Sequence, residues 1–154
     1  MDGNTGIART RYDEDFIAWA REQAVALRAR DFDAVDWDHV AEEMESLGNS
    51  DLAQLESRLI RLISHMLKLE YGLNDDPKRQ WRLTVSEQRR SIRRLLKRMP
   101  SLRAQVPGLI DDLYADAREE ALEGFAAYEP GRLSDYERTI PVVCAYSVES
   151  TLGS

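Results

Sequence analysis

Apolar side chains recur at intervals of three and four residues along most of this chain, and this spacing constrains the fold more than any other feature. Because an α-helix advances about 100° per residue, such spacing places the apolar side chains on one helix face. Stretches rich in Gly, Asn, Asp and Pro separate the periodic segments. The pattern predicts helices over residues 12–30, 37–47, 51–71, 78–98 and 107–125. We therefore expect an all-α fold, a single-domain bundle of about five helices with an irregular C-terminal segment.

Residues that commonly begin and end helices bound the segment 37–47. Asp36 is a suitable N-cap, Gly48 suits the position after the last turn, and Ser50 is a suitable cap for the next helix. The apolar residues of this segment are expected to face the core: Trp37, Val40, Ala41, Met44 and Leu47. The following segment, 51–71, has the widest apolar arc of the chain, which is typical of a central helix with neighbours on two sides.

The length of 154 residues suits one domain that folds without metals or disulfides. Residues 1–11 lack periodicity and are expected to form a flexible N-terminal arm. Residues 12–154 are expected to form the single helical-bundle domain. Within it, the apolar run 140–144 contains Pro141, which favours an extended segment packed across the end of the bundle.

Composition points to a cytoplasmic chain outside the membrane. The chain has 28 acidic and 21 basic residues, a net charge of −7, which favours solubility. Its one cysteine, Cys144, allows no internal disulfide and fits a reducing compartment. The first ten residues lack the apolar core of a signal peptide, and the longest apolar stretches fall far short of the roughly 20 residues that span a bilayer.

Basic residues are concentrated in the segment 78–98, which contains nine bases and one acid, Glu87. One interpretation is a solvated face that pairs with acidic helices of the same bundle. The other is a surface for an acidic protein partner. Nucleic acid is disfavoured because no aromatic side chains are interleaved with the bases for stacking, and because the overall charge is negative.

The densest group of acids lies in the segment 37–47. Glu43 borders its apolar stripe, and Glu42 lies next to it. We predict that this pair faces Arg82 and Arg89 of the basic segment, as a functional cluster or a buried ion-pair cluster, because a buried acid is costly unless it is paired.

A metal site is the alternative for the same region. His39 and Glu43 lie four residues apart and share a helix face, and His65 is the second of the two histidines. Helical bundles bind divalent metals with inward Glu and His side chains. The paired Glu-x-x-His elements of such sites are absent, and the spacing of Glu42, Glu43 and Glu45 differs from that of the all-α nucleotide pyrophosphohydrolases, which bind magnesium.

No catalytic residue is predicted. The sequence lacks a Gly-x-Ser-x-Gly elbow, a glycine-rich phosphate loop and a Cys-x-x-Cys pair. The neighbours of Cys144, Pro141 to Val143, are typical of packing rather than of an activated thiol. We expect no resident cofactor unless the metal alternative is correct.

Several short motifs occur together in a characteristic order. They are Tyr12-x-x-Asp15-Phe16-x-x-Trp19, Val40-Ala41-Glu42-Glu43-Met44-Glu45-Ser46-Leu47-Gly48, His65-Met66-Leu67-Lys68, Trp81-x-x-Thr84-Val85-x-x-Gln88-Arg89, Pro100-Ser101-Leu102 and Tyr114-x-x-Ala117-Arg118. Over residues 12–148 the chain resembles the bacterial family of uncharacterised helical proteins known as domain of unknown function 29. The resemblance implies a small intracellular helical protein and brings no activity, substrate or cofactor. It directs attention to the motif positions Glu42, Glu43, His65, Lys68, Trp81 and Arg89. Ala145 departs from the family's Cys-Pro-Tyr pattern, which weakens any role for Cys144.

Two functional hypotheses follow from the sequence. The first is a non-catalytic protein-interaction or self-associating helical module, whose partner is a second copy (a homodimer) or another protein. The second is a metal-binding helical bundle or metal-dependent hydrolase that uses Glu and His side chains of residues 37–71.

Overall fold

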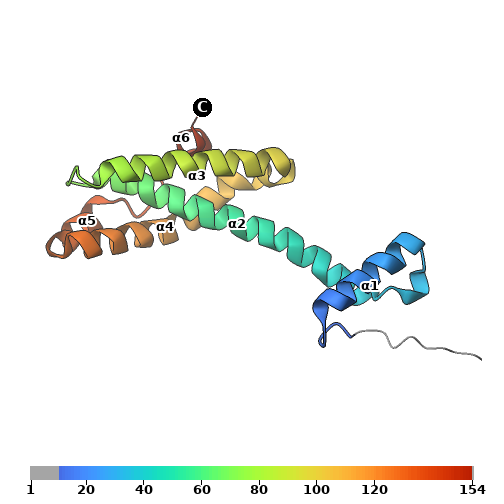
Figure 1. The fold of residues 1–154 in the computed structure, drawn as a ribbon. Helices are drawn as coiled ribbons and strands as arrows, with labels where there is room; N and C mark the ends of the chain where they lie inside the picture. Colours follow the sequence, from blue (N-terminus) through green and yellow to red (C-terminus); the bar gives the residue numbers. More distant parts are fainter. Residues whose placement is uncertain (1–10, 154) are drawn as a thin grey trace, which may run out of the picture. The chain divides into compact units, whose positions relative to one another are not determined.

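The computed structural model describes residues 11–153, and within them it contains helices and no strand. The helices are α1 (Phe16–Ala29), α2 (Trp37–Tyr71), α3 (Lys78–Arg98), α4 (Val106–Tyr128), α5 (Leu133–Thr139) and α6 (Val148–Leu152) (Figure 1). This confirms the all-α expectation. Most of the expected N-terminal arm, residues 1–10, lies outside the described residues.

Helix α2 replaces two of the expected helices. Gly48, Asn49 and Ser50 stay in helical conformation, so the expected break at Gly48 and the expected cap at Ser50 are wrong. A glycine inside a helix costs only about 1 kcal/mol relative to alanine, and an exposed helix tolerates it. Gly48 ends a helix only when it adopts a positive φ, and among the described glycines that conformation occurs at Gly153.

The chain divides after Ser50 into two compact units, residues 1–50 and 51–154. In the described part of the first unit, α1 is followed by the 3₁₀ turn Phe32–Ala34 and the beginning of α2. Asp15 caps α1 by accepting a hydrogen bond from the backbone N–H of Ala18, at 2.9 Å. Few side chains of this unit are buried: Trp19, Gln23, Ala26 and Val35.

The apolar stripe of residues 37–47 does not face a core, contrary to the sequence expectation. Trp37, Met44 and Leu47 are 54%, 62% and 61% exposed. The side of α2 that meets the rest of its unit is the one carrying His39 and Glu43, which contact Tyr12. Trp37 and Met44 lie on another side of the helix, so this unit leaves them uncovered.

The second unit has the extensive core. The later part of α2 lies between α3 and α4 (Figure 1), and all three helices contribute buried side chains. Trp81 is 8% exposed, as its place on the predicted α3 stripe requires. The aliphatic side chains that are 0% exposed come from all three helices: Leu55, Leu59, Leu62 and Ile63 of α2, Ile92 of α3, and Ala117 and Ala121 of α4. The helix 51–71 was therefore correctly expected to be central within this unit.

Two short helices near the C-terminus were missed by the sequence analysis. In α5, Tyr136 stacks on Phe125 of α4 with ring centroids 3.8 Å apart. The run 140–144 is non-helical, as expected, but of its aliphatic residues only Ile140 packs fully: Val142 and Val143 are 77% and 78% exposed. Within residues 11–153, no helix is both long enough and apolar enough to cross a membrane.

Candidate functional site

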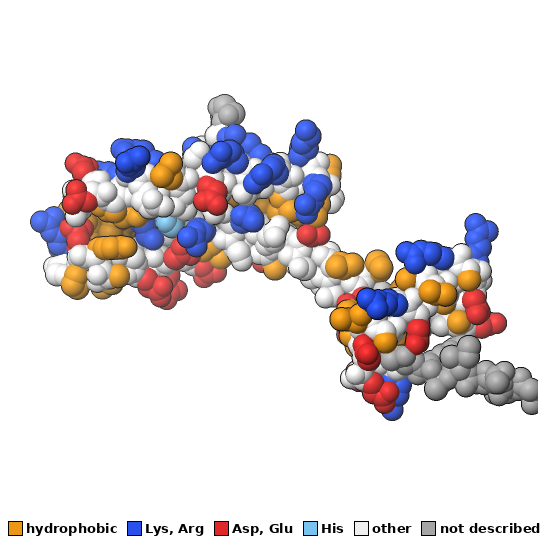
Figure 2. Space-filling view, viewed as in Figure 1, with side chains coloured by type: hydrophobic (Ala, Val, Ile, Leu, Met, Phe, Trp, Pro, Cys, Tyr) orange, Lys and Arg blue, Asp and Glu red, His pale blue; other side chains and the backbone are white. Residues whose placement is uncertain are grey.

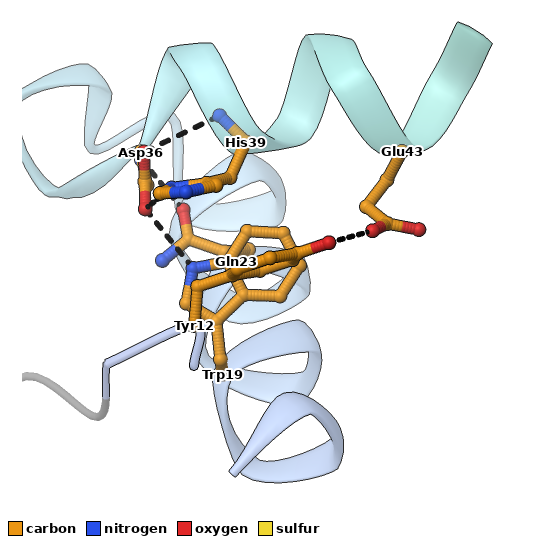
Figure 3. A network of polar contacts seen from close by, with 6 residues as sticks. All are labelled: Tyr12, Trp19, Gln23, Asp36, His39 and Glu43. Atoms are coloured by element: carbon orange, nitrogen blue, oxygen red, sulfur yellow. Dashed lines mark hydrogen bonds and ion pairs between the residues drawn. The ribbon is translucent and has the colours of Figure 1, made fainter. Parts of the chain in front are cut away.

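A polar and aromatic network ties the beginning of the described chain to α2 (Figure 3). The Tyr12 ring stacks on the His39 ring with centroids 4.2 Å apart, and its hydroxyl donates a hydrogen bond to Glu43. His39 Nδ1 lies 2.8 Å from Asp36 Oδ2, which also accepts a hydrogen bond from Trp19 Nε1 at 3.2 Å. One tyrosine, one tryptophan and one histidine are thus held by two carboxylates.

These contacts shift the ionisation of the groups involved. The hydrogen bond to the Asp36 carboxylate raises the pKa of His39 above its usual 6.5. The same contact with His39 lowers the pKa of Asp36 below its usual 3.8. The hydrogen bond to the Glu43 carboxylate is the main reason that the pKa of Tyr12 is raised to about 12.

The network positions side chains rather than activating one. Glu43 and Asp36 each accept from neighbouring donors, and the backbone N–H of Asp36 donates to the Gln23 amide oxygen at 2.7 Å. The predicted N-cap is also present, although it is long: His39 N lies 3.5 Å from Asp36 Oδ1. The geometry therefore fixes α1 against the start of α2 and sets which side of α2 remains exposed.

A second candidate surface lies on α3, where Lys and Arg side chains gather (Figure 2). Among the ion pairs of the described residues, the one that involves an α3 base joins Lys78 to Asp75 at 2.8 Å. Arg89 donates to the backbone oxygens of Thr151 and Ser150, at 2.9 and 2.8 Å. Arg93 likewise donates to the backbone oxygen of Leu152 at 2.6 Å, so both arginines bind carbonyl oxygens of α6 instead of carboxylates. One interpretation of the sequence was that the basic face pairs with acidic helices. Among the described residues of the second unit, the ion pairs do not join α3 to another helix.

An apolar groove runs beside this basic face, between α3 and α6. It measures about 560 Å³ and is lined by Leu96, Val106, Val148, Leu152, Arg93, Lys97 and Arg103. A neighbouring hollow of about 400 Å³ is lined by Arg82, Arg89, Arg90 and Arg93 together with Leu69, Val85 and Ser86. The two share Arg93, so bases and apolar side chains line a continuous stretch of α3.

The predicted cluster of Glu42, Glu43, Arg82 and Arg89 is distributed over both units. Glu42 is exposed, and Glu43 bonds to Tyr12 in the first unit. Arg82 and Arg89 lie on α3 in the second unit, where Arg89 holds the end of α6. The two acids lie in the first unit and the two arginines in the second, and the pairing of these acids with these arginines remains a prediction.

The residues of the metal hypothesis have other partners in the structure. His39 binds Asp36 through Nδ1, Glu43 accepts from Tyr12, and His65 Nδ1 donates to the backbone oxygen of Arg61 at 2.9 Å. Burial lowers the pKa of His65. Within the part of the chain that the structure describes, no three His, Cys, Asp or Glu side chains are grouped closely enough to hold a metal ion. Metal binding by His39, Glu43 and His65 remains a prediction.

The family model described as "Domain of unknown function DUF29" matches residues 11–154, nearly the whole chain. The chain belongs to this family. No curated protein and no solved structure matches it. The resemblance seen in the ordered motifs is thereby confirmed, and the DUF29 match assigns neither an activity nor a ligand.

Several DUF29 motif positions of this chain have structural roles. Trp81 fills the core against Phe125, with ring centroids 6.1 Å apart. Lys68 is 8% exposed, and its side chain lies against Gly124, where a Cβ atom would come within 2.6 Å of Cε. Burial lowers the pKa of Lys68. These positions hold the second unit of the DUF29 chain together.

The sequence analysis did not predict the polar and aromatic network of the first unit, whose central contact joins Asp36 and His39. It named His39 only as a ligand of the alternative metal site and Asp36 only as an N-cap, although the spacing of three residues was sufficient to suggest that they contact each other. The contacts of Trp19 with Asp36 and of Tyr12 with Glu43 join residues 17 and 31 positions apart. No local pattern encodes contacts of that range.

Proposed function

We propose that this DUF29 chain is a non-catalytic helical module that self-associates through its first unit. The observation that carries the proposal is the apolar surface of residues 11–50. Its large apolar side chains that are more than half exposed are Ile17, Val25, Phe32, Trp37, Met44 and Leu47. Trp37, Met44 and Leu47 lie close together along one side of α2, and a contiguous exposed apolar patch marks an interaction site.

The size of the first unit supports the same proposal. Its described part spans about 40 residues, near the length below which domains usually need disulfides, metals or oligomerisation for stability. Its buried side chains are few, and two of them, Trp19 and Gln23, also carry polar groups that bind Asp36. Burial of the exposed stripe against another chain would supply the apolar contact that this unit does not provide by itself.

The test is the molar mass of the intact chain in solution, measured by sedimentation equilibrium over a wide concentration range. We expect a concentration-dependent dimer. The double variant Met44→Glu/Leu47→Glu should shift it to monomer, because two charges would have to be buried in the interface. The matched control Val142→Glu/Val143→Glu adds the same charge at two highly exposed positions of the second unit and should leave the dimer intact.

A monodisperse monomer at all concentrations would contradict the proposal. Equal weakening by both double variants would contradict the role of the first unit, because general charge repulsion would then explain the loss.

A further inference from the structure

We propose that the basic groove of α3 and α6 binds the acidic apolar segment 31–47 of a second copy of this chain. The inference rests on the proposed self-association and names the two surfaces that meet.

The groove side has positive charge without carboxylate partners. Arg93 and Lys97 line the groove one turn apart on α3, and Arg82 lines the neighbouring hollow on the same side of the helix. In the part of the chain that the structure describes, no ion pair involves these three residues. Arg93 and Lys97, one helical turn apart, repel one another, and an acidic partner would relieve that repulsion.

The floor of the groove is apolar. Leu96 and Val106 are 6% and 1% exposed, and Val148 and Leu152 of α6 form the opposite wall. Arg103 adds a base at the rim. A ligand that fits this site presents apolar side chains to the floor and carboxylates to the rim. Nucleic acid meets the charge requirement but brings phosphates rather than aliphatic side chains to an aliphatic floor.

The segment 31–47 has the matching chemistry. It contains seven acids and no Lys or Arg. Along its helical part, the exposed apolar stripe of Trp37, Met44 and Leu47 lies beside an acidic edge formed by Asp38, Glu42 and Glu45. The third side of the helix, with His39 and Glu43, is occupied by the contacts with Tyr12. The side left exposed is thus the one that fits a basic groove with an apolar floor.

The lengths are compatible. The helical residues 37–47 extend over about 16 Å, and the basic stretch from Arg82 to Lys97 over about 24 Å, at 1.5 Å per residue. Every copy carries both surfaces, so two copies can exchange them reciprocally. Such an exchange closes a twofold-symmetric dimer, which buries both surfaces of both chains and leaves neither available for further growth.

A charge-exchange experiment tests this arrangement with the full chain. The groove variant Lys97→Glu/Arg103→Glu and the segment variant Glu42→Lys/Glu45→Lys should each be monomeric at concentrations where the unmodified chain is a dimer. Mixed in equal amounts, the two variants should form a heterodimer, because the native acidic segment of the first then faces the native basic groove of the second, and the new basic segment of the second faces the new acidic groove of the first. Sedimentation velocity with one variant fluorescently labelled measures the mixed species.

Matched controls test whether position or total charge matters. Arg79→Glu/Arg98→Glu reverses two α3 bases that do not line the groove, and Glu119→Lys/Glu123→Lys reverses two exposed acids of α4. Both controls should dimerise as the unmodified chain does. Circular dichroism at the same concentration checks that every variant is helical.

The outcomes separate this inference from the proposed function. If the unmodified chain dimerises and Met44→Glu/Leu47→Glu disrupts the dimer, but Lys97→Glu/Arg103→Glu has no effect, the groove is not the partner surface and self-association stands. Failure of the two complementary variants to associate when mixed also overturns the inference. If the unmodified chain is a monomer throughout, both the inference and the proposed function fail.

Discussion

The imidazole of His39 lies flat against the phenol of Tyr12, with ring centroids 4.2 Å apart and planes inclined by 16°. This stacking fixes which side of α2 faces the rest of the first unit. His39 is oriented for the contact by Asp36, 2.8 Å from its Nδ1. The exposure of Met44 follows, because a residue five positions after His39 lies about 140° around the helix from it.

The Asp36–His39 pair should make the stability of the first unit depend on pH. Because the pKa of His39 is raised in the folded protein, this residue adds fully to the stability of the fold below pH 6.5, and the added stability is lost as the pH rises through the folded-state pKa. Because the pKa of Asp36 is lowered in the folded protein, this residue adds fully to the stability of the fold above pH 3.8, and the added stability is lost as the pH falls through the folded-state pKa. The pair therefore stabilises this unit most between these two limits.

NMR titration of the two histidine rings checks this directly. His39 should titrate above 6.5 and His65, whose pKa burial lowers, below it. Asp36→Asn should bring His39 back toward 6.5 and leave His65 unchanged. A His39 that titrates at its usual value in the unmodified chain would contradict the contact.

Trp81→Ala should destabilise the second unit by about 3–5 kcal/mol, the usual cost of removing a buried aromatic side chain. The matched control is Trp37→Ala, because Trp37 is 54% exposed where Trp81 is 8% exposed. In dilute, monomeric protein Trp37→Ala should cost less than about 1 kcal/mol. Urea unfolding measures both, and equal costs would refute the assignment of Trp81 to the core.

Gly72→Ala should destabilise the fold by about 1–3 kcal/mol through overpacking. A Cβ atom at Gly72 would come within 2.4 Å of the backbone oxygen of Lys68 and 2.8 Å of the Trp81 ring, and neither can move freely. Gly48→Ala, inside α2, is the control, since a Cβ atom there meets nothing within 4 Å. It should stabilise α2 by about 0.5–1 kcal/mol. Thermal unfolding distinguishes the opposite signs.

Arg89→Ala should loosen the end of the chain. Its guanidinium donates to the backbone oxygens of Thr151 and Ser150, and these contacts hold α6 on α3. Hydrogen exchange of the α6 amides should therefore become faster, while exchange in α4 stays unchanged. Arg90→Ala removes a neighbouring guanidinium that makes no such bond to α6 and should have no effect. Unchanged α6 exchange in Arg89→Ala would rule out the anchoring role.

The metal hypothesis makes a prediction that separates it from self-association. Protein purified without chelator should then hold stoichiometric divalent metal, and His39→Ala or His65→Ala should each remove it, because both rings would be ligands. Elemental analysis by mass spectrometry measures the content. A metal-free chain would contradict this hypothesis and leave the proposed dimer untouched.

The α3 segment shows how far sequence reasoning reached. Its bounds, Lys78–Arg98, and the burial of Trp81 and Ile92 agree with the periodicity. The amphipathic pattern there is strong, and one apolar face against a basic remainder leaves a single orientation for the helix.

Residues 48–50 show where local signals misled. Glycine, asparagine and serine in succession favour a break, yet α2 continues through them. The sequence pattern did not predict α5 and α6, because it gives too little local signal there. They are too short for periodicity, and contacts such as the stacking of Tyr136 on Phe125 stabilise them from outside their own sequence.

The sequence by itself determined the all-α class, the family, the core face of α3 and the concentration of positive charge on that helix. These depend on local periodicity and composition, which each segment carries within itself. Tertiary structure alone decided that Trp37, Met44 and Leu47 are exposed and that Arg89 binds α6. An apolar stripe indicates that a helix face favours burial. Whether that face is covered depends on which other elements pack against it, and the local sequence does not determine this.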